Sequence, residues 1–291
     1  MSSPPLFDHQ QKSLEFLQGK TSVFDTSDPG TGKTRTQIEW YAAHRAAGGK
    51  KAIIIAPKSI LRAAWVNDFS KFAPHIKTSV ATADKREKAF AVDADVYVTN
   101  TDAVNWLVKQ PKSFFKDFDT IIIDEISAFK HHTSARSKAL NKIKRHFVHR
   151  HGLTGTPSSN AITDIWHQMY ILDDGARLGR SFYQFRNSVQ VPEQVGPQPN
   201  MLKWTDKPGA AMAVGSLIQD ITIRHKFEEC LSIPANHEYS VPFYMSPKLA
   251  HVYTEFQNNA IIQLKDNKII SSVNAAGVMN KLLQIASGAS Y

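Results

Sequence analysis

The sequence has a single cysteine, Cys230, among its 291 residues. One thiol can form neither an internal disulfide nor a thiolate metal site, so we expect a reducing compartment. No apolar run approaches the roughly 20 residues that span a bilayer, and the opening MSSPPLFDHQ lacks the basic and apolar regions of a signal peptide. These absences predict a soluble intracellular protein with no membrane partner.

Acidic residues are also in deficit. Asp and Glu number 26 against 35 Lys and Arg, which gives a formal charge of +9. This balance fits a polyanionic partner, most simply nucleic acid, and equally well a merely basic soluble protein. Hydrophobic residues make up 42% of the chain, which is enough to bury a core, so we expect a folded protein.

Short β-branched runs recur along the first half of the chain. The predicted strands are 22–26, 52–56, 95–100, 120–124 and 151–155. Continuous apolar runs, without alternation, indicate strands that are covered on both faces, as in a parallel sheet. A helical face lies between two of them, at Leu61, Trp65, Phe69 and Phe72. The alternation of strand and helix predicts an α/β doubly wound domain.

The pattern changes after about residue 160. Residues 161–186 are predicted to be helical, and the Pro- and Gly-rich stretch 188–200 is predicted to be an exposed loop or insertion. A strand candidate at 237–245 precedes a further helical pattern, for which Ser246 is the expected N-cap and Pro247 the first helical residue.

The first glycine of a phosphate-binding loop is missing from TSDPGTGKT, residues 26–34. The full pattern is G-x-x-x-x-G-K-[ST], and here Ser27 stands first, with Gly32, Lys33 and Thr34 in the last three positions. The small serine can still turn the chain between a strand and a helix. The backbone N–H groups would then face the β- and γ-phosphates, Lys33 would add charge, and Thr34 would ligate Mg²⁺. We interpret the loop as a nucleotide site and not as an incidental glycine-rich turn.

An acidic pair completes this interpretation. TIIIDEIS places Asp124 and Glu125 at the end of an apolar strand. Asp124 can hold Mg²⁺, and Glu125 can orient or deprotonate the attacking water. The pair is a weak signal alone and a strong one together with the loop, because two adjacent carboxylates suit hydrolysis.

The order and spacing of these blocks resemble superfamily 2 helicases and translocases, and among them the Swi/Snf-type ATPases. LFDHQQKSLEFL looks like the glutamine motif and DPGTGKT like motif I. IIIAPKSILRAAWVNDFSKF, VYVTNTDAV and HGLTGTPSSN are similar to motifs Ia, Ib and III. Motifs Ia and III are the specific parts, and a phosphate-loop kinase would need neither. The closing KLLQIASGASY resembles phage and bacterial members, so the expected location is the cytoplasm of a bacterial cell, or of a host if the protein is phage-encoded.

The resemblance implies a RecA-like P-loop NTPase domain and a set of site residues. Catalytic roles fall on Lys33, Asp124 and Glu125, with Mg²⁺ held by Thr34 and Asp124. The residues expected to bind ATP are Gln10, Asp28, Gly30, Thr31, Gly32, Lys33 and Thr34, with Gln10 contacting adenine. Those expected to contact nucleic acid, DNA before RNA, are Lys58, Ser59, Thr99, Asn100, Thr101, Thr154, Gly155 and Thr156. Motif II is DEIS, where the family has DEAH or DEAD, so Ser127 is expected to couple differently to motif III.

The resemblance also suggests a division of the chain. We expect 1–160 to form the ATP-binding core, and 161–291 to be the remainder of the first lobe, with a helical insertion, a helical and strand extension and a connector. The family's second lobe carries an arginine finger, which is worth roughly 10³–10⁵ in rate. That lobe would have to be supplied in cis or in trans, so hydrolysis by this chain alone is expected to be weak or absent. The alternative is a catalytically silent module that binds nucleic acid or a protein partner.

Two further features are ambiguous. The basic tract 130–151 fits either a path along a duplex backbone or a solvated helix face. Its basic residues are Lys130, Arg136, Lys138, Lys142, Lys144, Arg145 and Arg150. The histidines within it, His131, His132, His146, His149 and His151, match neither a zinc finger nor a helical metalloprotease pair. We therefore interpret them as surface or core residues.

Overall fold

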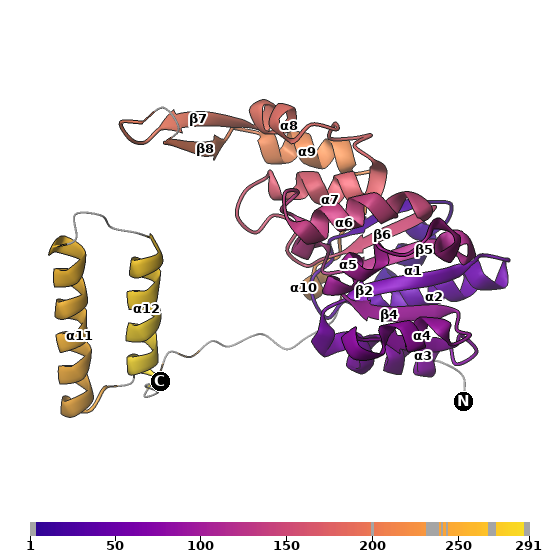
Figure 1. The fold of residues 1–291 in the computed structure, drawn as a ribbon, viewed down its shortest axis with the longest axis horizontal. Coiled ribbons are helices and arrows are strands. Elements are labelled where there is room, and N and C mark those ends of the chain that lie inside the picture. Colours follow the sequence, from indigo (N-terminus) through magenta and orange to yellow (C-terminus); the bar gives the residue numbers. More distant parts are fainter. Residues whose placement is uncertain are drawn as a thin grey trace. The chain divides into compact units, whose positions relative to one another are not determined.

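The structure, a computed structural model, describes residues 4–198, 201–230, 239, 241–242, 244–266 and 272–287. The chain divides into two compact units, Met1–Ile233 and Pro234–Tyr291 (Figure 1). The elements that follow residue 160 in the first unit pack into the same core as the strands before it.

A parallel sheet forms the centre of the first unit. Its strands are β1 (Ser22–Asp25), β2 (Lys51–Ala56), β3 (Thr78–Ala81), β4 (Val96–Asn100), β5 (Phe118–Asp124), β6 (His149–Leu153) and β9 (Thr222–Ile223). They lie in the order β3-β4-β2-β5-β6-β1-β9, and every registered pair is parallel. The predicted parallel sheet is confirmed. The short strands β3 and β9 were not predicted.

Helices cover both faces of this sheet (Figure 1). The helices of the first unit are α1 (Asp8–Leu17), α2 (Lys33–Ala46), α3 (Asn67–Phe72), α4 (Arg86–Ala91), α5 (Val104–Leu107), α6 (Ala135–Ile143), α7 (Asp164–Asp173), α8 (Phe182–Val189), α9 (Ala210–Ile218) and α10 (Phe227–Cys230), of which α8 and α9 lie beyond α7. Ile54 of β2 packs in a cluster with residues of α1, α2 and α3, whereas Ile53 and Ile55 pack in a second cluster with α5, α6 and α7. Burial on both faces explains why the strand sequences are continuously apolar.

The helical face predicted after β2 is built in two parts. A 3₁₀ turn, Lys58–Ile60, leads into a π-helical turn, Leu61–Val66, which continues as α3. Leu61, Trp65 and Phe69 are buried as predicted. A π-helical turn holds an extra residue and is often found at functional sites. Here it carries Trp65 into the core beside β5.

The second half differs from two predictions. The predicted helix 161–186 is interrupted between α7 and α8, where Asp174 and Gly175 adopt left-handed backbone conformations. For the stretch 188–200, predicted to be an exposed loop or insertion, the loop is wrong at Gln190–Gln194, because this strand, β7, pairs with β8 (Leu202–Asp206) in an antiparallel hairpin. Pro192 is tolerated there because a two-stranded ribbon has only edge strands.

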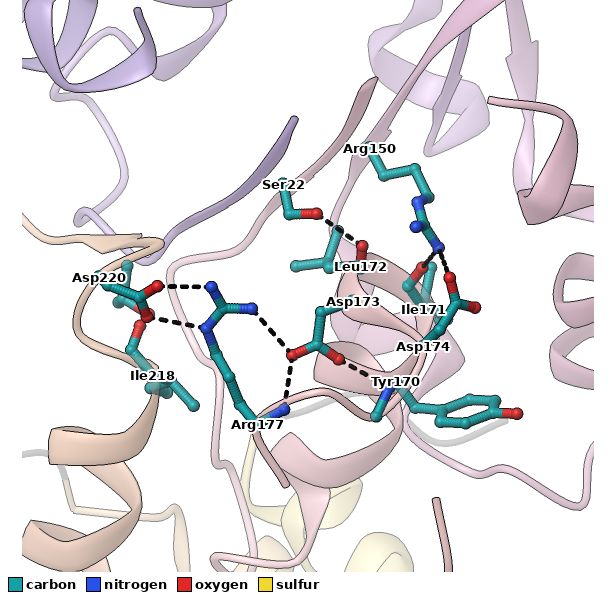
Figure 2. A network of polar contacts seen from close by, with 12 residues as sticks. Ser22, Arg150, Tyr170, Ile171, Leu172, Asp173, Asp174, Arg177, Ile218 and Asp220 are labelled. Atoms are coloured by element: carbon teal, nitrogen blue, oxygen red, sulfur yellow. Dashed lines mark hydrogen bonds and ion pairs between the residues drawn. The ribbon is translucent and has the colours of Figure 1, made fainter. Parts of the chain in front are cut away.

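A polar network holds the end of α7 against the sheet (Figure 2). Arg177 joins Asp173 to Asp220, and Arg150 of β6 donates to Asp174 at 2.8 Å. Lys144, whose side chain is buried, pairs with the same Asp174 at 3.0 Å. Lys144 and Arg150 therefore stabilise the fold through ion pairs, and Lys130 pairs with Asp164. All three belong to the basic tract 130–151. Its remaining basic residues, Arg136, Lys138, Lys142 and Arg145, are exposed.

The second unit contains α11 (Pro247–Asp266) and α12 (Ser272–Ala286), which pack against each other. The N–H of Leu249 donates to Ser246 Oγ at 3.3 Å, so the predicted cap at Ser246 and first helical residue at Pro247 are confirmed. Part of the predicted strand 237–245 lies outside the described residues, and its described part is not a strand. Within the described ranges, no helix combines the length and the hydropathy that crossing a membrane requires.

Candidate nucleotide site

Three neighbouring strands end at the same level. Asp25 of β1 is in register with Leu153 of β6, which is in register with Asp124 of β5. The phosphate loop follows β1, Glu125 follows β5, and motif III continues from the end of β6. Because the carboxyl ends of parallel strands form one edge, the three motifs meet there, as ligand sites in open α/β sheets do.

The loop 26–32 is shaped by two glycines. Gly30 and Gly32 have φ of 85° and 83°, in the left-handed region that favours glycine. Helix α2 begins at Lys33, and among the described residues no side chain caps its first turn, where Thr34 also lies. The N–H groups of that turn are therefore available to an anion. Lys33 Nζ donates to the carbonyl oxygens of Ser27 and Asp28, at 2.6 and 3.0 Å.

Gln10 lies directly against this loop. Its Oε1 accepts from the N–H of Phe7 at 3.1 Å, which fixes the side chain. An added Cβ at Gly32 would lie 2.1 Å from Gln10 Nε2, so the two residues are in close contact. A cavity of about 460 Å³ opens beside them, within the size range of small-molecule sites. Its lining includes Phe7, Gln10, Gly30, Gly32, Lys33, Thr34 and Phe72.

Asp124 is buried at the carboxyl end of β5 and is oriented by motif Ia. The indole Nε1 of Trp65 donates to Asp124 Oδ2 at 2.9 Å. Burial raises the pKa of Asp124 above its ordinary value, although the hydrogen bond from Trp65 and the charge of Lys33 oppose that rise.

Glu125 has a left-handed backbone conformation, with φ and ψ both 56°. Such strain in a non-glycine residue costs on the order of 1–3 kcal/mol and clusters at functional sites. Glu125 Oε2 accepts from Ser127 Oγ and from Thr154 Oγ1, each at 3.3 Å. Ser127, which departs from the family pattern, thus contacts the same carboxylate as motif III.

Motif III also packs on the phosphate loop. The N–H of Thr154 donates to the carbonyl of Asp25 at 3.0 Å. A Cβ at Gly155 would lie 2.9 Å from Pro29 Cδ, so only glycine lets the two loops approach this closely. Thr154 therefore bridges two elements, since its backbone holds β1 and its hydroxyl holds Glu125.

Residues 223–227 complete the loop from the other side, and this contact with the loop was not predicted from the sequence. The N–H of His225 donates to Ser27 Oγ at 3.0 Å, and the N–H of Phe227 donates to Asp28 Oδ2 at 3.1 Å. The Phe227 ring lies 2.8 Å from where a Cβ of Gly30 would be. Ser27, in the place of the missing glycine, therefore has a structural role: its hydroxyl joins the loop to a segment that is distant in sequence.

The residues predicted to contact nucleic acid divide by exposure. Ile55 is in register with Thr99 and Ala56 with Asn100, so the residues after β2 and β4 lie at the same edge as the nucleotide site. Lys58, Ser59 and Thr156 are exposed, whereas Asn100, Thr101 and Gly155 are half-buried. Thr99 and Thr154 are fully buried, and the hydroxyl of Thr99 donates to the carbonyl of Ala81. Their side chains are therefore not available to a nucleic acid in this structure.

Comparison with known proteins gives a consistent picture. The SNF2-related domain family matches residues 9–287. The putative protein p41 of Acyrthosiphon pisum secondary endosymbiont phage 1 is 28% identical over 256 residues, covering 83% of this chain and 54% of p41. An uncharacterized ATP-dependent helicase of Mycoplasma pneumoniae is 30% identical over 175 residues, covering 55% of this chain and 16% of the helicase. The chain thus spans about half the length of p41 and a smaller part of the helicase.

A solved structure has the same fold. The SWI2/SNF2 ATPase core of Sulfolobus solfataricus, in complex with dsDNA, matches with a TM-score of 0.63 at 21% identity, covering 98% of this chain and 58% of that one. The chain therefore has the RecA-like fold of that ATPase core. The chain belongs to the SNF2-related domain family.

Proposed function

We propose that this chain is the ATP-binding lobe of a Swi/Snf-type DNA translocase, which couples ATP hydrolysis to movement on nucleic acid. The observation that carries the proposal is the convergence of the phosphate loop, Asp124 and motif III at the ends of β1, β5 and β6. A catalytically silent module would not require a strained Glu125, whose carboxylate is hydrogen-bonded by two hydroxyls.

The residues at this edge fit a triphosphate and its magnesium ion. The uncapped first turn of α2 supplies N–H donors, and Lys33 supplies a positive charge. The Thr34 hydroxyl and the Asp124 carboxylate are oxygen ligands of the kind that Mg²⁺ prefers. When bound, the ion would neutralise charge on the β- and γ-phosphate oxygens. Gln10 and Phe7, which line the cavity at the loop's flank, would contact the base.

Each remaining residue then has a role. Lys33 exchanges its two carbonyl partners for phosphate oxygens. Glu125 orients the attacking water and accepts its proton, while Thr154 and Ser127 hold the carboxylate in place. Because Thr154 also contacts β1, a change at the phosphates can be transmitted to Gly155 and Thr156, which continue toward the exposed edge.

DNA is the proposed track, and it would lie along the same edge. Lys58 and Ser59 after β2, Asn100 at the end of β4, Thr101 after it, and Thr156 offer charge, hydroxyls and backbone N–H groups to phosphates without contacting bases. The solved SWI2/SNF2 core is described in complex with dsDNA, which favours DNA over RNA. The described residues hold one parallel sheet, so an arginine-bearing second lobe must act in cis or in trans for fast hydrolysis.

The test is phosphate release by the chain with and without duplex DNA, in wild type and Glu125→Gln. We expect slow turnover that DNA stimulates and that Glu125→Gln abolishes, while MgATP still binds. Glu87→Gln, at an exposed position on α4, is the matched control and should behave as wild type. DNA binding without any ATP binding would instead favour the silent module.

A further inference from the structure

Two histidines and an aspartate meet at the edge of the sheet opposite the nucleotide site. His44 lies in the last turn of α2, Asp119 near the start of β5, and His149 at the start of β6. One potential ligand atom from each residue lies within 4.8 Å of the others. This is the one such group of metal-ligating side chains found among the described residues, and nothing in the proposed function uses it.

The carboxylate of this group is held in a fixed orientation. Asp119 Oδ2 lies 3.0 Å from His44 Nε2 and accepts from the N–H of Lys50 at 2.8 Å, while Oδ1 accepts from Thr120 Oγ1 at 2.7 Å. Burial alone would raise the pKa of Asp119, but these hydrogen bonds outweigh it and hold the pKa below its ordinary value. The group is therefore an ionised, oriented ligand, with the supporting hydrogen bonds that metal-binding carboxylates usually have.

The histidines are also held in place. The His44 ring stacks on Trp40, with centroids 5.2 Å apart and an interplanar angle of 4°. The His149 ring meets the His44 ring edge-on at 4.6 Å. A Cβ at Gly49 would lie 2.2 Å from His44 Nε2, so glycine is needed at 49 for the ring to occupy its place.

One nitrogen in the cluster lacks a partner. His149 Nδ1 is buried and makes no hydrogen bond within the described part of the chain. Buried polar atoms are rarely left in this state, and each one calls for an explanation such as an ion. The hydrogen bond between His44 and Asp119 leaves the His149 Nδ1 without a partner, whereas a cation shared by the three residues would supply one.

We propose that His44, Asp119 and His149 bind a zinc ion that ties the end of α2 to the starts of β5 and β6. Two imidazole nitrogens and one carboxylate oxygen suit zinc and other late first-row ions, whereas Mg²⁺ and Ca²⁺ prefer all-oxygen sites. Bonds of about 2.0–2.1 Å in a tetrahedral site bring ligand atoms to about 3.3 Å apart, which small side-chain rotations from the present separation provide. The partly exposed cluster leaves the fourth position to water.

Zinc titration of the EDTA-treated full chain, by calorimetry and by thermal melting, tests the proposal. Wild type should bind one equivalent and melt at a higher temperature with zinc. His149→Ala should weaken zinc binding by at least about 100-fold, because loss of an outer-shell partner alone costs about 10- to 100-fold. Asp119→Asn should weaken it similarly. His75→Ala removes an exposed histidine and is the matched control, expected to bind as wild type.

Two results would overturn the proposal. One is equal zinc affinity in wild type and His149→Ala; the other is an equal loss in His75→Ala, which marks adventitious binding to surface histidines. If His149→Ala does not fold, zinc titration of His149→Gln and the visible absorption of Co²⁺-loaded wild type replace it. A four-coordinate Co²⁺ site gives intense absorption bands, whereas adventitious octahedral binding does not. ATP affinity should be the same in wild type and His149→Ala, which keeps this test independent of the nucleotide site.

Discussion

The indole of Trp65 donates a hydrogen bond of 2.9 Å to the carboxylate of Asp124, and both side chains are buried. Trp65 comes from the π-helical turn after β2, and Asp124 ends the neighbouring strand β5. The turn that follows the exposed Lys58 and Ser59 thus also orients the carboxylate proposed to hold Mg²⁺. If nucleic acid displaced that turn, the hydrogen bond from Trp65 would shift the Asp124 carboxylate that we propose binds Mg²⁺.

Trp65→Phe should keep an aromatic ring in the core and remove this hydrogen bond together with part of the buried indole. Because a hydrogen bond to a charged group is worth about 1.5–3 kcal/mol, we expect MgATP affinity to fall by roughly tenfold. Trp166→Phe is the matched control, since it removes an indole bond of 3.1 Å to Gly179 and should leave the affinity unchanged. Equal affinities of the two variants for MgATP in a calorimetric titration would refute the positioning role of Trp65.

Asp124→Asn should stabilise the nucleotide-free protein at neutral pH. Burial raises the pKa of Asp124 above the ordinary 3.8, so the folded state binds its proton more tightly than the unfolded chain does. The penalty for folding is therefore absent below the unfolded pKa, grows as the pH rises toward the folded pKa, and is complete above it. Asn has no charge and avoids this penalty.

Thermal melts at pH 7.5 and 4.5 measure the effect. The Tm of Asp124→Asn should exceed that of wild type by about 2–4 °C for each kcal/mol of folding penalty removed. The difference should be larger at pH 7.5 than at pH 4.5. Asp117→Asn, at an exposed site on the 3₁₀ turn before β5, should change Tm little at either pH. A lower Tm for Asp124→Asn than for wild type at pH 7.5 would contradict the account.

Gly155→Ala should disturb the contact between motif III and the phosphate loop. The added methyl would lie 2.9 Å from Pro29 Cδ, whose ring cannot rotate away. We expect a cost of about 1–3 kcal/mol, as for other overpacked sites, and an ATP affinity several-fold weaker. Gly215→Ala on α9 meets nothing within 4 Å and should be neutral or slightly stabilising. Unchanged ATP affinity in Gly155→Ala would show that the two loops are not coupled.

Lys58→Ala should weaken duplex DNA binding and lower its dependence on salt. Each lost phosphate contact reduces the slope of log K against log salt by about 1. Lys77→Ala removes an equally exposed lysine that lies just before β3, at the opposite edge of the sheet, and should leave the slope unchanged. Anisotropy titrations between about 50 and 200 mM salt measure both, and equal slopes would place the DNA elsewhere.

Much of the fold followed from local pattern. The buried strands β2, β4 and β5 are continuous apolar runs, and the cap at Ser246 is a local signal, so both were predicted from sequence. Strand β3 has 4 residues, of which every second one is buried, and so short a pattern does not predict a strand. The hairpin of β7 and β8 was missed because Pro192 and the nearby glycine are typical of a loop, and only pairing with β8 reveals the strand.

The site was predictable only where its residues are adjacent in sequence. Lys33, Thr34, Asp124 and Glu125 belong to contiguous motifs that meet at strand ends. Contacts between segments far apart, such as His225 with Ser27, leave no spacing to recognise. The same applies to His149, whose neighbours in the tract suggested no metal, because its partners at 44 and 119 come from other elements.

The central claim is that MgATP binds where β1 turns into α2, held by Lys33. Calorimetric titration of MgATP into wild type and Lys33→Ala tests it most directly, with the exposed Lys142→Ala as the control. We predict one site in wild type and in the control, and an affinity at least tenfold weaker in Lys33→Ala, because its ammonium is worth about 1.5–3 kcal/mol to a phosphate partner. Equal affinity in Lys33→Ala and wild type would contradict the claim.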